Sequence, residues 1–377
     1  MVSVENFYNC LKESGVSMFA GVPDSLLKSL CAYITDNTDE SHNIIAANEG
    51  AAVGIAAGHY LATGKVPVVY MQNSGIGNAV NPLLSLADEK VYSLPILLII
   101  GWRGEPGIHD EPQHVKQGAV TLPLLKAMGI PYIVLPDENK AAMEAVEKVI
   151  GECRVASKPH AIVIRKDTFG KYKLKNEVVN NYSLSREDAL SLMVSAIDSK
   201  SVVVSTTGKL SRELFELRES MGLGHENDFL TVGSMGHSSS IALGIALEKP
   251  ERKVYCFDGD GAFLMHMGAV SNIGALAPSK FIHVVFNNGV HESVGGQPSS
   301  GFDIDICAVA RACGYKEAIR VSATEEFEKI STRLNSLEGP VLIELMVGIG
   351  SRANLGRPTT TPIENKDAFM RNLCGDI

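Results

Sequence analysis

Two short polar segments near the middle of the chain have the residue types that bind a hard cation and a phosphate group. A Gly-Asp-Gly segment at residues 259–261 follows the apolar run 253–257, and an Asn-Asn pair at 287–288 closes the apolar run 281–287. Carboxylate, amide and carbonyl oxygens, together with phosphate oxygens, form the octahedral shell that Mg²⁺ requires. Glycines let the backbone approach a phosphate closely. The sequence therefore predicts a magnesium and phosphate site where two strands end.

Apolar β-rich runs alternate with Ala- and Leu-rich helical segments along the whole chain. Continuous apolar runs, without in-and-out alternation, are typical of parallel strands that are buried on both faces. The expected strands are Val66–Gln72, Leu94–Ile100, Ala161–Arg165, Ser201–Thr206, Lys253–Phe257, Phe281–Asn287 and Val341–Met346, and the expected helices include Glu49–Thr63, Ala141–Cys153, Ser238–Leu247 and Gly268–Ala277. In doubly wound sheets, ligands bind beyond the carboxyl ends of such strands. The pattern predicts an α/β fold with two doubly wound parallel-sheet domains.

The length of 377 residues exceeds the size at which one hydrophobic core usually divides into two domains. A polar stretch at residues 171–184 is the best candidate for a linker, because the capping residues 185–188 after it open a helix that is expected to begin at Ala189. We therefore expect a first domain at 1–170 and a second at 185–347. A Gly-, Arg-, Pro- and Thr-rich tail at 348–377 follows and is a candidate active-site lid.

Composition and charge exclude several classes of function. The net charge is −9, which disfavours binding to nucleic acid or to an anionic membrane. No apolar run reaches the ~18 residues of a membrane span, and no signal peptide is visible at the N-terminus. The seven cysteines are odd in number and have no CxxC spacing, as expected of reduced thiols rather than a zinc site. We expect a cytoplasmic protein without nucleic-acid or membrane partners.

The two polar segments together resemble the thiamine diphosphate motif, in which a Gly-Asp-Gly is followed by an Asn-Asn pair. Here residues 262–286 separate them, and both close apolar strands. The chain is thus similar to the thiamine diphosphate-dependent 2-oxo acid decarboxylase family. This resemblance implies a pyrimidine-binding domain followed by a diphosphate-binding domain, with thiamine diphosphate and Mg²⁺ as cofactors. The chain leaves no room for the middle domain that most members carry.

The resemblance also implies residues that bind the metal and the cofactor. Asp260, Asn288 and the backbone carbonyl of Val290 would hold Mg²⁺. The implied cofactor-binding residues are Glu49, Thr207, Gly233, Met235, Gly259, Gly261 and Ala262. Thr207 would stand on a phosphate-facing turn, and Gly261 and Ala262 would offer N–H groups to the diphosphate. Met235 would wedge between the two rings of the cofactor, and the Gly233 carbonyl would accept from its aminopyrimidine.

Three residues in the first half of the chain are catalytic candidates. Glu49 precedes a run of Ala and Gly. A lone glutamate at a helix N-terminus is usually a surface charge. This segment, however, matches the family pattern. The resemblance implies that Glu49 contacts the aminopyrimidine and so promotes formation of the thiamine diphosphate ylid. Asp24, in a turn that resembles the family's F-G-V-P-G-D segment, would assist proton transfer. His114, which is expected in a Gly- and Pro-rich loop, is an acid or base candidate.

The compact length resembles the phosphonopyruvate and sulfopyruvate decarboxylase branch of the family. The resemblance implies decarboxylation of 3-phosphonopyruvate to phosphonoacetaldehyde and CO₂ in phosphonate biosynthesis, with sulfopyruvate or another 2-oxo acid as the alternative substrate. A small polyanionic 2-oxo acid needs local cations in a protein of net charge −9. The candidates in Gly-containing loops are Arg103, Lys209, Arg352 and Arg357. Active sites between the subunits of a homo-oligomer are also implied.

Two readings outside this class stay open at this point. A dinucleotide-binding oxidoreductase would need a G-x-G-x-x-G segment after an early strand, and neither half of the chain shows one cleanly. A regulatory subunit without activity would be expected to lose Glu49 or Asp260, and both are present.

Overall fold

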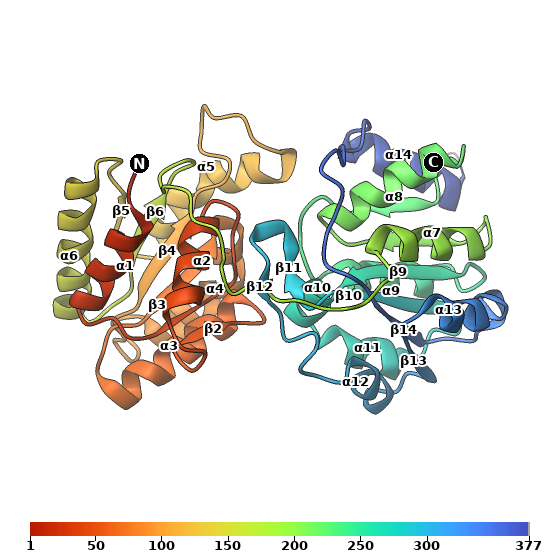
Figure 1. Cartoon of the computed structure of the whole chain (residues 1–377), viewed down its shortest axis with the longest axis horizontal. Helices are drawn as coiled ribbons and strands as arrows, with labels where there is room; N and C mark the ends of the chain where they lie inside the picture. Colours follow the sequence, from red (N-terminus) through yellow and green to blue (C-terminus); the bar gives the residue numbers. More distant parts are fainter. Residues whose placement is uncertain (376–377) are drawn as a thin grey trace. The chain divides into compact units, whose positions relative to one another are not determined.

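The computed structural model describes residues 1–375, and the chain divides into two compact units (Figure 1). The first unit comprises residues 1–177 and 291–298, and the second comprises the other described residues, 178–290 and 299–375. The short hairpin of β11 (Val290–His291) and β12 (Gln297–Pro298) occurs where the chain passes from one unit to the other and back.

The first unit is built on a six-stranded sheet in the order β2-β1-β3-β4-β6-β5, in which every pairing is parallel. The strands are β1 (Phe19–Gly21), β2 (Asn43–Ile45), β3 (Val68–Gln72), β4 (Leu97–Gly101), β5 (Tyr132–Val134) and β6 (His160–Ile164). The α-helices are α1 (Val4–Glu13), α2 (Lys28–Asn37), α3 (Glu49–Thr63), α4 (Ile76–Pro82), α5 (Pro112–Ala127) and α6 (Asn139–Ala156).

The second unit repeats this plan with the order β13-β14-β10-β9-β7-β8, again parallel throughout. Its strands are β7 (Val202–Ser205), β8 (Asp228–Leu230), β9 (Val254–Gly259), β10 (Phe281–Asn287), β13 (Glu317–Val321) and β14 (Val341–Met346). Its α-helices are α7 (Arg186–Ala196), α8 (Lys209–Ser220), α9 (Ser238–Glu248), α10 (Asp260–Met265), α11 (Ala269–Leu276), α12 (Ile306–Ala312), α13 (Thr324–Ser331) and α14 (Pro362–Cys374).

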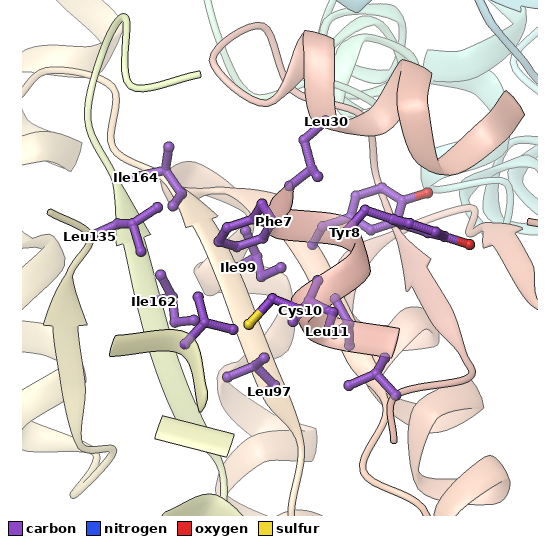
Figure 2. Close-up of a cluster of buried hydrophobic side chains, with 14 of the residues drawn as sticks. Phe7, Tyr8, Cys10, Leu11, Leu30, Leu97, Ile99, Leu135, Ile162 and Ile164 are labelled. Carbon is purple, nitrogen blue, oxygen red and sulfur yellow. The ribbon is translucent and has the colours of Figure 1, made fainter. Parts of the chain in front are cut away.

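Each sheet has a hydrophobic core on both faces, because helices cover both. On one face of the first sheet, Phe7 and Leu11 of α1 pack with Leu30 of α2 and with Leu97 and Ile99 of β4 (Figure 2). The opposite face packs against side chains of α3, α4 and α5. In the second unit, residues of α7, α8 and α13 line one face, and residues of α9, α11 and α12 line the other. Strands buried on both faces explain the continuous apolar runs of the sequence.

The predicted α/β fold with two doubly wound parallel sheets is confirmed, and all seven expected strands are present within two to three residues of their expected ends. Strands β1, β2, β5 and β8 were not predicted, because three residues give too short an apolar run, and β13, whose five residues include Glu317 and Arg320, was missed as well. Helix α14 was also missed in the polar tail, where Thr361 and Glu364 form a capping box. Within residues 1–375, no helix combines the length and the apolar character needed to cross a bilayer.

Candidate active site

Asp260 lies where β9 ends and α10 begins, and its carboxylate is buried. The hydroxyl of Ser299 donates to Asp260 Oδ2, and the backbone N–H groups of Gly261 and Asn288 also donate to this carboxylate. Burial raises the pKa of Asp260 to about 6, against the lowering effect of these donors. The bond from Asn288 joins the Gly-Asp-Gly segment to the Asn-Asn segment, so the two are neighbours as predicted from the topology.

The turn after β10 presents Asn288 and Val290. Gly289 has φ +74°, a left-handed conformation that glycine adopts without strain. The Gly289 N–H donates to Asn287 Oδ1 at 3.1 Å, and the Val290 N–H donates to Asn288 Oδ1 at 3.1 Å. Asn180 Nδ2 donates to the Asn288 carbonyl at 3.1 Å. The turn is therefore held from several directions.

These residues fit a bound divalent cation. The partners of the Asp260 carboxylate are a hydroxyl and N–H groups, which leave its negative charge without a full countercharge in a buried position. A cation that takes oxygen ligands would offset this cost, and the carboxylate, amide and carbonyl oxygens of Asp260, Asn288 and Val290 are ligands of that kind. Gly301 lies directly against this group, since a Cβ at its position would overlap Asp260 and Asn287.

The other predicted cofactor residues of the second unit lie in loops and in the first turn of a helix. Gly261 and Ala262 are buried in the first turn of α10, directly after Gly259. Thr207 precedes α8 and is half-buried, while the hydroxyl of its neighbour Thr206 is buried without a hydrogen-bond partner. The loop that precedes α9 carries the half-buried Met235 and, two residues earlier, Gly233. Its backbone passes through left-handed conformations at φ +54° and φ +85° on either side of Met235.

Glu49 is the first residue of α3, and only 5% of it is exposed. The side chain of Asn48 caps the helix by accepting from the Ala51 N–H at 2.9 Å. Asn78 Nδ2 donates to Glu49 Oε2 at 2.7 Å. A Cβ at Gly75 would overlap the Glu49 carboxylate, so glycine is needed there for the carboxylate to keep this position. The surface-charge reading of Glu49 is thus replaced by a buried and fixed carboxylate.

Asp24 is buried in the same unit, at the turn that follows β1. Its Oδ2 accepts from the N–H groups of Leu26 at 3.0 Å and Leu27 at 3.3 Å, and its Oδ1 has no hydrogen-bond partner. Burial raises the pKa of Asp24 to about 6, although the backbone N–H groups and the nearby Arg103 lower it. A carboxyl group with a pKa in this range can exchange a proton near neutral pH.

Replacing Asp24 by asparagine should stabilise the protein without cofactor, and more at pH 8 than at pH 5. Because the pKa of Asp24 is raised above the unfolded value, its contribution to stability is complete below the unfolded pKa and is lost as the pH rises through about 6. The amide of the variant does not ionise, so the advantage of the variant grows with pH toward about 3 kcal/mol. Thermal unfolding at both pH values, with the exposed Asp137→Asn as control, measures this; an advantage that does not change with pH contradicts it.

His114 and Arg103 lie close to one another in the chain that follows β4. The expectation of a loop was wrong for His114, which is buried in the first turn of α5, a helix that begins at Pro112; a Cβ at Gly104 would overlap the His114 carbonyl. Arg103 makes a two-pronged ion pair with Asp110, with Nε at 2.7 Å from Oδ2, and its Nη1 donates to Ser25 at 2.8 Å. Arg103 therefore fastens this loop to the turn that carries Asp24.

The remaining predicted substrate-binding cations lie in the second unit and contact other residues. Lys209 is the first residue of α8 and not part of a loop as expected, and its Nζ donates to Ser351 Oγ at 2.7 Å. Arg352 pairs with Glu187 and with Glu216, and these two carboxylates raise its pKa. Arg357 is exposed in the tail. Binding of an anion by Arg103 or Arg352 would therefore compete with an existing carboxylate partner.

Several residues of the site were not found by sequence reasoning. Ser299 and Asn78 hold the Asp260 and Glu49 carboxylates, and Asp110 holds Arg103. Neither the serine, in a loop, nor the asparagine, in α4, belongs to a distinctive sequence spacing, so no signal marked the first two. Asp110 was visible as an acid close to Arg103, but only the structure shows that the two pair.

Comparisons with known proteins agree with this geometry. Residues 1–123 match the N-terminal TPP binding domain of thiamine pyrophosphate enzymes, and residues 207–345 match the C-terminal TPP binding domain. The chain belongs to the thiamine pyrophosphate enzyme family. Like its relatives below, this thiamine pyrophosphate enzyme is a carboxy-lyase, and its cofactor is thiamine diphosphate.

Three relatives of this thiamine pyrophosphate enzyme align over nearly the whole chain. The phosphonopyruvate decarboxylase of Streptomyces viridochromogenes is 32% identical over 97% of this chain and 93% of its own length. The phosphonopyruvate decarboxylase of Streptomyces hygroscopicus is 33% identical, over 97% of this chain and 92% of its own. The sulfopyruvate decarboxylase of Methanosarcina acetivorans is 30% identical, over 98% and 97%. A dinucleotide-binding oxidoreductase is thereby excluded.

Proposed function

We propose that this enzyme decarboxylates 3-phosphonopyruvate to phosphonoacetaldehyde and CO₂ in phosphonate biosynthesis. The observation that carries the substrate is the alignment, over 97% of the chain, with two relatives named phosphonopyruvate decarboxylase. The observation that carries the reaction is the pair of buried carboxylates, Glu49 and Asp260, each fixed by hydrogen bonds in a separate unit. Sulfopyruvate is the alternative substrate, because one relative of similar identity bears that name.

Thiamine diphosphate, when bound, supplies an electron sink for the bond that breaks as CO₂ leaves. In this proposal residues 1–170 hold the pyrimidine part and residues 185–347 hold the diphosphate and Mg²⁺. Glu49 would hold a proton between its carboxylate and the aminopyrimidine, and Asn78 keeps that carboxylate in place. Asp24, whose pKa is about 6, would deliver the proton that replaces CO₂. His114 is the second candidate for that transfer.

Asp260, Asn288 and the Val290 carbonyl would bind Mg²⁺ and through it the diphosphate. The N–H groups of Gly261 and Ala262 would donate to the diphosphate. The support is chemical, since all three metal donors are hard oxygens and the buried carboxylate needs a countercharge. The predicted cofactor site is completed by Thr207, Gly233, Met235 and Gly259, and the tail at 348–377 is a proposed lid.

The substrate is tested by comparing kcat/KM for phosphonopyruvate, sulfopyruvate and pyruvate under identical conditions. We expect kcat/KM for phosphonopyruvate to exceed the values for both other substrates by at least about tenfold. A charged group that is missing or misplaced in the bound substrate costs more than about 1.4 kcal/mol, which corresponds to that factor. Phosphorus NMR should show phosphonoacetaldehyde as the product. A higher value for sulfopyruvate would favour the alternative, and a strong preference for pyruvate would refute a polyanionic substrate.

The same assay ranks the four candidate substrate cations. Lys209, Arg357, Arg103 and Arg352 are each replaced by methionine, and KM is measured for phosphonopyruvate and pyruvate. If a residue binds the phosphonate, its replacement raises KM for phosphonopyruvate but not for pyruvate. If a residue only pairs with a neighbouring carboxylate, its replacement changes both KM values or neither.

We also propose that the enzyme is a homo-oligomer with active sites between subunits. The support is an exposed face of α3 formed by Ala51, Gly54, Gly58 and Leu61, the last 70% exposed. A Cβ at Gly54 or Gly58 would meet no atom within 4 Å, so a second helix could approach closely there. Light scattering on the eluting protein should give at least twice the 40.4 kDa chain mass. A mass of one chain at assay concentration would contradict the proposal.

A further inference from the structure

Glu344 is a carboxylate in the middle of the otherwise apolar strand β14, and none of its surface is exposed. β14 pairs in parallel with β10, and the register places Glu344 beside Val285, two residues before Asn287. Because alternate residues of a strand share a face, Glu344 and Asn287 lie on the same side of the sheet. A buried charge is costly unless it is well paired, so its partners indicate what it does.

The two oxygens of Glu344 have different partners. Oε2 accepts from Arg320 Nε at 2.8 Å and from the Cys307 thiol at 3.5 Å. Oε1 accepts from Asn287 Nδ2 at 2.9 Å. The Arg320 guanidinium is half-exposed and also donates to Asp305 at 3.2 Å. Arg320 therefore compensates the charge of Glu344 at one oxygen, and the other oxygen is directed at Asn287.

Glu344 determines which way the Asn287 amide points. Asn287 Nδ2 uses its two hydrogens on Glu344 Oε1 and on the Gly301 carbonyl at 2.7 Å, while Oδ1 accepts from the Gly289 N–H at 3.1 Å. In the reversed orientation, Oδ1 would face two acceptors and the NH₂ group would face a donor. The carboxylate at Glu344 thus makes one orientation of the amide strongly preferred.

This orientation connects Asn287 to both sides of the proposed metal site. Through Gly289 it holds the turn that carries Asn288 and Val290. Through the Gly301 carbonyl it holds the loop in which the Gly301 N–H donates to Ser299 Oγ at 3.2 Å. Ser299 in turn donates to the carboxylate of Asp260, a proposed metal ligand.

We propose that Glu344 is a positioning residue for the Mg²⁺ site: by orienting the Asn287 amide, it holds the donors Asp260, Asn288 and Val290 in place. The inference rests on the proposed metal site. Partners of metal ligands typically change metal affinity by roughly 10- to 100-fold when they are removed, although they do not touch the ion. Glu344 would act one contact further from the ion than such a partner, because it bonds to Asn287 and not to a metal ligand itself.

Glu344→Gln separates this role from a merely structural one. The new amide has a single oxygen for two donors, Arg320 and Asn287, and the charged guanidinium takes it because a charge-assisted bond is the stronger. The NH₂ of the new amide then faces the NH₂ of Asn287, which must turn and lose its bonds to Gly289 and Gly301. Adding Arg320→Met frees the oxygen for Asn287 and should restore its orientation.

Mg²⁺ affinity is measured by calorimetric titration at saturating thiamine diphosphate. Glu344→Gln should raise the Mg²⁺ Kd by at least about tenfold, while kcat at saturating Mg²⁺ stays within about threefold of wild type. The double variant with Arg320→Met should return to within about threefold of the wild-type Kd. Arg333→Met, which removes an exposed ion pair to Glu317 in the same unit, is the matched control and should leave Kd unchanged.

An unchanged Kd in Glu344→Gln overturns the proposal, and so does a double variant that binds as weakly as the single one. If Glu344→Gln does not fold, Glu344→Asp decides instead, because it keeps the charge beside Arg320 but withdraws the carboxylate from Asn287. A Kd about tenfold weaker in that variant supports the proposal, and a wild-type Kd overturns it. Cofactor binding by wild type that is independent of Mg²⁺ refutes the metal site itself, whatever Glu344 does.

Discussion

Replacing Glu49 by glutamine should lower kcat by about three orders of magnitude, within the range of a lost general acid or base. Glutamine has nearly the same shape as glutamate and can still accept from Asn78, so the fold and the cofactor site should survive. What it lacks is the ability to hold and release a proton at the carboxylate. The effect should therefore appear in kcat, while the Kd for thiamine diphosphate changes by less than about threefold.

The control for this variant is Glu144→Gln, which alters an exposed glutamate of α6 that pairs loosely with Lys140 at 3.9 Å. It should have wild-type kcat. Thermal unfolding of both variants checks that the fold is intact. Turnover within about tenfold of wild type in Glu49→Gln would show that the carboxylate has no role in proton transfer.

Replacing Asp260 by asparagine should abolish Mg²⁺-dependent binding of thiamine diphosphate, with a Kd at least about 100-fold higher. The charged oxygen is the strongest of the three proposed donors, and a neutral amide is a poor substitute for it at a hard cation. Asparagine keeps an oxygen for the N–H donors of Gly261 and Asn288, so the protein should still fold.

Calorimetry with thiamine diphosphate at millimolar Mg²⁺ measures this loss directly, without relying on turnover. Asp367→Asn is the matched control, because Asp367 is a partly exposed aspartate of α14 in the same unit. It should bind the cofactor with the wild-type Kd. An Asp260→Asn variant that also binds with the wild-type Kd would remove Asp260 from the metal site.

Much of the fold was predictable because the strands that carry the site are long and wholly apolar. β10 was predicted with its observed ends, and α3 begins and ends where the Ala and Gly pattern indicated. Edge strands such as β8, with three residues, give no comparable signal. The same holds for α14, about half of whose residues are polar and whose position depends on contacts such as that between Phe369 and Phe229.

The parts of the candidate site that depend on the spacing of short sequence motifs were predictable. The parts that depend on contacts between segments far apart in the sequence were not. The Gly-Asp-Gly and Asn-Asn segments end neighbouring strands, so parallel topology alone brings them together. The partners of the Asp260 carboxylate and of the Asn287 amide come from distant loops and strands, as Ser299 and Glu344 show. The sequence presented Glu344 only as an isolated charge in an apolar strand. That anomaly has a physical reason only once its hydrogen bonds to Asn287 and Arg320 are seen.

The most direct test of the account is reconstitution of CO₂ release from phosphonopyruvate. The protein is dialysed against a chelator until both cofactors are removed, and Mg²⁺ and thiamine diphosphate are then restored separately and together. We expect that neither addition alone restores more than a few per cent of the activity and that both together restore it fully. Full CO₂ release from the dialysed protein without thiamine diphosphate would contradict it.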